Sequence, residues 1–114
     1  MVYKIIITPP AKKSLDRYVR YTAVTLQNKE AAIAIIEDAR NTKNRLAKIA
    51  NIISPCQHPV LAQFEYRKIH FRKHDFFMVY RIEGDKVIVD GMFHDLQDFD
   101  AVFIDTLSND NNEE

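Results

Sequence analysis

The chain has few of the residues that several common kinds of site require. It has two glycines, Gly84 and Gly91, whereas a P-loop or a dinucleotide-binding loop needs several glycines close together. Its one cysteine, Cys56, excludes an internal disulfide and a thiolate zinc motif and is typical of a reducing compartment. No apolar run approaches the about 20 residues of a membrane-spanning helix. The sequence therefore predicts no disulfide framework, no metal, no cofactor and no membrane partner.

The length and composition are those of one small globular domain. The chain has 114 residues, of which 46% are hydrophobic and 28% are charged, enough for one modest core. Its N-terminus has no signal-peptide pattern, which predicts a cytoplasmic protein. We expect a single domain over residues 1–107 and a disordered acidic tail over 108–114, because the tail has nothing to pack.

The charges balance overall but are unevenly distributed. There are 16 basic and 16 acidic side chains, and residues 95–114 contain seven of the acids and no Lys or Arg. The first 94 residues are left with 16 basic and nine acidic side chains, a net charge of +7. A basic body is what a nucleic acid or an acidic protein partner would require. The alternative for the end of the chain is a tail that is simply solvated.

The N-terminal half shows the pattern of a strand followed by two helices. Residues 2–7 are β-branched and aromatic, which indicates a strand. Thr8 is a good N-cap for a first amphipathic helix over about 10–26, whose first turn tolerates proline. Asn28 can cap a longer second helix that ends before Pro55. The short connection predicts an antiparallel helical hairpin.

The C-terminal half changes to the period of strands. A loop from 54 to about 63 precedes three predicted strands, over 64–71, 76–82 and 86–93. Their short turns, one with Gly84, force antiparallel neighbours. Over 97–107, apolar residues at helical spacing predict a short helix or tail that folds back on the body. The expected fold is α+β, of order β-α-α-β-β-β, with a helical hairpin on one face of a small, mainly antiparallel sheet.

Alternation along the strands assigns side chains to the two sheet faces. In the last strand it places Gly91 and Phe93 on the covered face, and Met92 and His94 on the other. The face that the helices leave uncovered would then hold Lys68, His70, Arg72, Arg81, Asp90 and His94, with Tyr66 and Phe77 as aromatic surfaces. Such a patch can hold a phosphate backbone and stack a base. The alternative is a wet face, which is common in antiparallel sheets.

Three segments of the C-terminal half form an ordered set. They are YRKIHF at 66–71, FMVYRIEGD at 77–85 and VIVDGMFH at 87–94, followed by Gln97-Asp98-Phe99. This set resembles the "YR.I" strand, the "YRI" strand with its turn, and the strand closing on "H…D" of RelE/ParE toxins. The resemblance spans about residues 2–103. It implies the toxin of a bacterial type II toxin–antitoxin system that inhibits growth and is bound by a cognate antitoxin protein.

The resemblance implies one of two targets, because the family has two branches. The RelE-like branch consists of mRNA interferases that bind RNA and cut mRNA on the ribosome, whereas the ParE-like branch inhibits DNA gyrase without catalytic residues. Lys68 and His70 match a basic pair of the RelE-like strand, and Arg72 matches a further basic position. Phe77 and Leu96, however, stand where an RNA-cutting relative has Arg. The segment from His94 to Gln97-Asp98 and the YRIEGD turn at 80–85 resemble the ParE-like branch.

A metal-independent cleavage mechanism defines the candidate catalytic residues. A base takes the proton of the 2′-hydroxyl, an acid protonates the leaving oxygen, and cations stabilise the added charge. Histidine titrates nearest neutral pH, so His70 and His94 are the candidate base and acid. The remaining candidates are Lys68 and Arg81 for catalysis, and Arg72, Tyr66, Phe77 and Asp98 for substrate binding or for orienting His94.

Three functions thus stay open from the sequence. The chain is a ribosome-dependent endoribonuclease, a non-catalytic toxin that binds gyrase, or a degenerate toxin that retains only antitoxin binding. The third alternative follows from the missing Arg residues.

Overall fold

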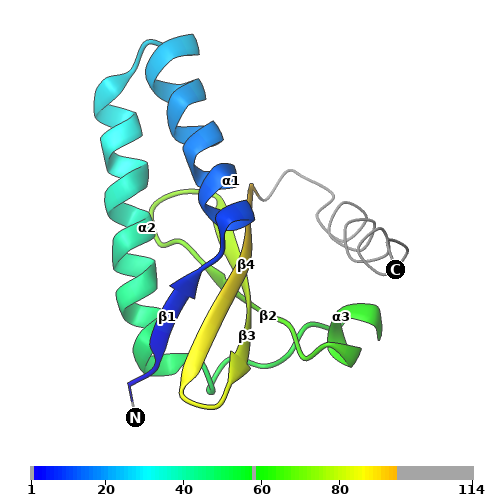
Figure 1. Ribbon diagram of the computed structural model, residues 1–114. Coiled ribbons are helices and arrows are strands. Elements are labelled where there is room, and N and C mark those ends of the chain that lie inside the picture. Colours follow the sequence, from blue (N-terminus) through cyan, green and yellow to red (C-terminus); the bar gives the residue numbers. More distant parts are fainter. Residues whose placement is uncertain (1, 58, 95–114) are drawn as a thin grey trace.

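The computed structural model describes residues 2–57 and 59–94 (Figure 1). Its elements are β1 Lys4–Ile7, α1 Pro9–Arg20, the π-helical turn η1 Tyr21–Thr25, α2 Lys29–Ile49, α3 Pro59–Gln63, β2 Arg67–His70, β3 Phe76–Glu83 and β4 Lys86–His94. The four strands form one sheet in the order β1-β4-β3-β2. β1 is parallel to β4 and the other pairs are antiparallel. The predicted α+β fold, with a helical hairpin on a mainly antiparallel sheet, is confirmed.

The ends of the two long helices are fixed by different contacts. Thr8 stands at the N-cap of α1, but its hydroxyl donates to the carbonyl of Val89 at 3.0 Å and caps no helical N–H. Asn28 does cap α2, because its side chain accepts from the backbone N–H of Ala31 at 3.0 Å. The left-handed Gln27, with φ of 50°, turns the chain between the helices. Thr8 therefore ties the start of α1 to β4 instead of serving as the predicted cap.

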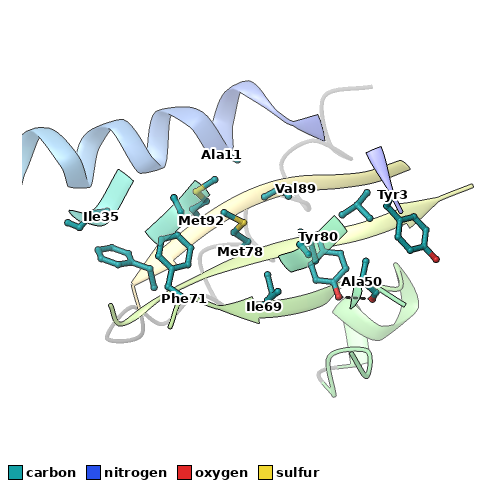
Figure 2. Close-up of a cluster of buried hydrophobic side chains, with 14 residues drawn as sticks. Tyr3, Ala11, Ile35, Ala50, Ile69, Phe71, Met78, Tyr80, Val89 and Met92 are labelled. Carbon is teal, nitrogen blue, oxygen red and sulfur yellow. Dashed lines mark hydrogen bonds between the residues drawn. The ribbon is translucent and has the colours of Figure 1, made fainter. Parts of the chain in front are cut away.

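The main core lies between the helical hairpin and the sheet (Figure 2). Its fully buried members include Leu46 of α2, Tyr80 of β3 and Val89 of β4. The Tyr80 hydroxyl donates to the carbonyl of Ala50 at 2.8 Å, and burial raises the pKa of Tyr80 to about 12. Arg67 donates to the same carbonyl and to that of Ile53. These donors satisfy carbonyls that the end of α2 would leave without partners.

A second, smaller core covers part of the opposite sheet face. Leu61 of α3 is buried there with Tyr66, Phe77 and Val79. The segment 54–63 was expected to be a loop, but it contains α3 and packs on the sheet. Tyr66 and Phe77 are only 6% and 4% exposed. The prediction that these two rings form aromatic surfaces on an open face is wrong, because Leu61 and Cys56 pack against them.

A bulge in β4 changes which face its last residues occupy. Val79 pairs with Gly91 and Tyr80 pairs with Val89, so Asp90 is an extra residue in β4. Beyond a bulge the alternation of side chains is offset by one residue. Met92 is therefore buried in the helix-side core, while Phe93 packs in the smaller one. The prediction from strict alternation is wrong for the four residues after Asp90.

Candidate functional site: the sheet face opposite the helices

Phe77 is the centre of the sheet face opposite the helices, which we call the second face. The Nζ of Lys68 lies 5.2 Å from the centroid of the Phe77 ring, a cation–π distance. The ring of His70 lies 5.4 Å from the same ring, and His70 pairs with Phe77 across β2 and β3. Two predicted catalytic residues, Lys68 and His70, are thus brought together here.

Arg81 lies on the second face within a network of hydrogen bonds. Its Nε donates to Oδ2 of Asp90 at 2.9 Å, and its guanidinium also pairs with Glu83. The Tyr66 hydroxyl donates to the same Asp90 oxygen at 2.9 Å. Burial would lower the pKa of Arg81, but the hydrogen bond and charge of Asp90 outweigh it and raise that pKa. Arg81 is therefore committed to two carboxylates, which reduces its capacity to neutralise a phosphate.

The Tyr66–Asp90 bond gives a measurable stability effect. Burial, and then Asp90, raise the pKa of Tyr66, so its hydroxyl stays protonated as a donor. Replacing Tyr66 with Phe should lower the free energy of unfolding by about 1 kcal/mol, the net value of such a bond. Chemical unfolding of both chains measures this difference. Tyr21→Phe is the control, because Tyr21 is 54% exposed. An equal loss from Tyr66→Phe in an Asp90→Ala background would contradict the assignment.

His94 lies on the face opposite His70. It pairs with Phe76 across β3 and β4, and its ring meets the Phe76 ring edge-on at a centroid distance of 5.0 Å. Phe76 belongs to the helix-side core. The hypothesis that His70 and His94 share one strand face is therefore wrong, and the bulge at Asp90 is the reason. Whether either histidine takes part in catalysis stays a prediction.

Arg72 also lies away from the second face. β2 ends at His70, and Arg72 lines a polar pocket beside α2 together with Arg45 and Asp38. Burial, and then the positive charge of Arg72, lower the pKa of Arg45. The predicted grouping of Arg72 with Lys68 and His70 is wrong, because the strand ends before alternation can place it there. The other predicted binding residue, Asp98, lies outside the described residues.

Asp38 is a buried acid whose role the sequence analysis missed. It is 3% exposed, and its Oδ2 accepts the backbone N–H of Lys73 at 3.0 Å. The same oxygen lies 2.7 Å from Nδ1 of His74. Asp38 thus joins α2 to the β2–β3 turn. The available signal was an acid between Ile35 and Ala39, within the apolar face of the predicted helix.

Within residues 2–57 and 59–94, no three His, Cys, Asp or Glu side chains gather in a way that could hold a metal ion. Among the same residues, no helix combines the length and apolar character needed to cross a bilayer.

Comparison with known proteins relates the chain to toxins of toxin–antitoxin systems. The chain is similar in structure to the chromosomal ParDE toxin–antitoxin system from P. aeruginosa, with a TM-score of 0.67, 17% identity, and coverage of 82% of this chain and 96% of that one. It is also similar to the toxin–antitoxin complex RelBE2 from Mycobacterium tuberculosis, with a TM-score of 0.53, 15% identity, and coverage of 82% and 99%. At these identities the likeness shows the fold. No curated protein matches the sequence.

A match between the sequence and a family model shows the family, which the structural likeness alone does not. The model of the ParE toxin of the type II toxin–antitoxin system parDE matches residues 5–99. This range includes every described element except the first residue of β1. The chain therefore belongs to the ParE toxin family, within the RelE/ParE superfamily.

Proposed function

We propose that this chain is the toxin of a type II toxin–antitoxin pair and that it inhibits growth by binding DNA gyrase, without catalysis. The family supports a toxin, and its ParE branch supports gyrase as the target. The single observation that carries the non-catalytic mechanism is the bulge at Asp90, which separates His70 from His94.

The positions of the candidate catalytic side chains disfavour RNA cleavage. Cleavage by a 2′-hydroxyl needs a base and an acid that reach one phosphate together. His70 contacts Phe77 on the second face, whereas His94 contacts Phe76 on the helix side. Arg81, the candidate cation, is paired with Asp90 and Glu83. A toxin that acts by binding needs none of these groups to transfer a proton.

The proposed partner that controls the toxin is a cognate antitoxin. Both structural neighbours come from toxin–antitoxin systems, and the RelBE2 structure is that of a complex. The net charge of +7 on the first 94 residues suits an acidic protein partner. The cytoplasmic location expected from the sequence belongs to the same proposal.

A ribosome-dependent endoribonuclease is the second candidate. It is favoured by one observation, the convergence of Lys68 and His70 on Phe77. On this alternative His70 alone would act as the base, and Lys68 would stabilise the phosphate.

Replacement of the histidines separates the two candidates. We expect His70→Gln, His94→Gln and the double variant to inhibit growth as strongly as the parent when expressed without antitoxin, because no proton transfer is required. His70 is exposed, so His70→Gln should fold. His94 packs on Phe76, so thermal unfolding of its variants serves as the folding control.

Two readouts identify the target. Purified parent toxin should inhibit supercoiling by gyrase, while primer extension on cellular mRNA should show no new cleavage ends after induction. New cleavage ends that disappear in His70→Gln would overturn the proposal in favour of the endoribonuclease. A parent chain that binds antitoxin but does not slow growth would instead identify a degenerate toxin.

A further inference from the structure

A polar pocket lies between α2 and the connection from β2 to β3, which passes beside that helix (Figure 1). Its volume is about 250 Å³. Two basic side chains of α2, Arg45 and Lys48, line it, and Arg72 joins them from the connection. Among the described residues that line the pocket, Asp38 is the one acid. Three cations and one carboxylate leave the lining with a net charge of +2.

The spacing of the α2 residues brings their side chains to one face of the helix. Asn41, Asn44, Arg45 and Lys48 all line the pocket, and separations of three and four residues make neighbours on a helix surface. The Arg45 guanidinium also donates to the carbonyl of His70, which holds Arg45 beside the end of β2. Each asparagine adds an amide that can donate hydrogen bonds. The pocket thus gathers N–H donors from about two turns of α2.

The acid of the pocket is engaged with other groups. Asp38 is 3% exposed, and its Oδ2 accepts the backbone N–H of Lys73 and lies against Nδ1 of His74. Within residues 2–57 and 59–94, the side chains of Arg72 and Lys48 form no ion pair with a carboxylate. These cations are therefore available to an anion from outside the chain.

The two guanidiniums of the pocket repel each other, and this repulsion favours an anion as the ligand. Burial, and then the positive charge of Arg72, lower the pKa of Arg45. An anion bound between them would replace the repulsion with two attractions.

A phosphate group suits this lining better than a carboxylate does. One guanidinium already satisfies both oxygens of a carboxylate in a single plane. A phosphate group has more oxygens, arranged in three dimensions, so it can accept hydrogen bonds from several cations and amides at once. The lining offers donors of both kinds, from the helix and from the connection that faces it.

We propose that Arg45, Lys48 and Arg72 form a binding site for a phosphate group, carried either by inorganic phosphate or by the backbone of a nucleic acid. The three cations contact the phosphate oxygens, and the amides of Asn41 and Asn44 donate to them. None of these residues belongs to the second face, so this inference does not depend on the proposed target.

The Nε–H signal of Arg45 provides the test. The full-length ¹⁵N-labelled chain is titrated at constant ionic strength with sodium phosphate, with a short duplex DNA and with glutarate, a dicarboxylate. We expect a saturable shift of this signal with phosphate, with DNA or with both, and binding of glutarate that is weaker by at least about tenfold. A shift with phosphate identifies the free ion as a ligand, whereas a shift with DNA alone identifies the nucleic-acid backbone. Saturation by neither probe, or equal binding of glutarate, would overturn the proposal.

Two pairs of variants separate a built site from general charge. Lys48→Gln, Arg72→Gln removes two cations of the pocket at exposed positions and keeps Arg45. Arg20→Gln, Lys29→Gln removes the same net charge at exposed positions outside the pocket. The first pair should weaken binding of the probe that saturates by about tenfold or more, and the control pair should weaken it much less. Equal losses from the two pairs would mean that net charge alone attracts the anion, which would overturn the site.

Discussion

Replacing Leu46 with alanine is expected to lower the free energy of unfolding by about 3 kcal/mol. Leu46 lies in α2 and is fully buried in the core between the helices and the sheet. The change removes buried apolar atoms and leaves a cavity, because interiors are close-packed and relax only in part. Urea unfolding of both chains measures the difference.

Ile33→Ala provides the matched control for this result. Ile33 lies in the same helix but is 56% exposed, so its truncation should cost well under about 1 kcal/mol. If both replacements had the same effect, α2 would not be packed on the sheet through Leu46, and the arrangement of the core would be contradicted.

Replacing Asp38 with alanine is expected to cost about 2 kcal/mol at neutral pH, because it leaves two part-buried donors without their acceptor. Its carboxylate accepts from the backbone N–H of Lys73 and contacts His74, joining α2 to the β2–β3 turn. Asp38→Asn keeps one acceptor oxygen and should lose less. Equal losses from the two variants would contradict the role of the hydrogen bonds.

The same residue predicts a loss of stability in acid. Burial would raise the pKa of Asp38, but the hydrogen bonds from His74 and from the backbone of Lys73 and Arg72 outweigh it and lower that pKa. A carboxyl whose pKa is lower in the folded state stabilises the fold above its unfolded pKa, and this contribution is lost as pH falls through the folded pKa. Unfolding free energies of the parent should therefore fall in acid below about pH 4. The Asp38→Ala chain should show a shallower fall, and parallel curves would contradict the assignment.

Local patterns were sufficient to predict the fold because each element obeys its own period. The apolar spacing in α2 is regular, and β3 begins with a run of five apolar and aromatic residues that is typical of a buried strand. The short turns, one with Gly84 at a φ of 63°, favour hairpins. The bulge could not be located in this way. A prediction from alternation assumes that each residue of a strand faces one residue of the neighbouring strand, and Asp90 has no such counterpart in β3. Its one signal was Gly91, because a glycine inside a strand often marks a bulge. A Cβ on Gly91 would lie 2.6 Å from the Phe93 ring, so a side chain at this position would have to displace that ring.

The candidate site was predicted less completely because it depends on contacts between distant segments. Alternation predicts that Lys68 and His70 lie on the same face of β2. In the structure both side chains lie beside the Phe77 ring. The burial of Tyr66 and Phe77 depends on Leu61 packing beneath the sheet, which no period in that short segment indicates. The separation of His94 from His70 depends on a single extra residue, Asp90.

The parallel pairing of β1 with β4 has a consequence for the order of folding during synthesis. Lys4 pairs with Lys86, so the first strand has no partner until nearly all the described chain has left the ribosome. The helical hairpin and the β2–β3 pair, in contrast, join residues that are near in sequence. Because contacts distant in sequence form slowly, we expect closure of this sheet edge to be the late step. A nascent chain interrupted before residue 86 would have an unpaired β1, so this toxin should complete its sheet only after β4 has emerged from the ribosome.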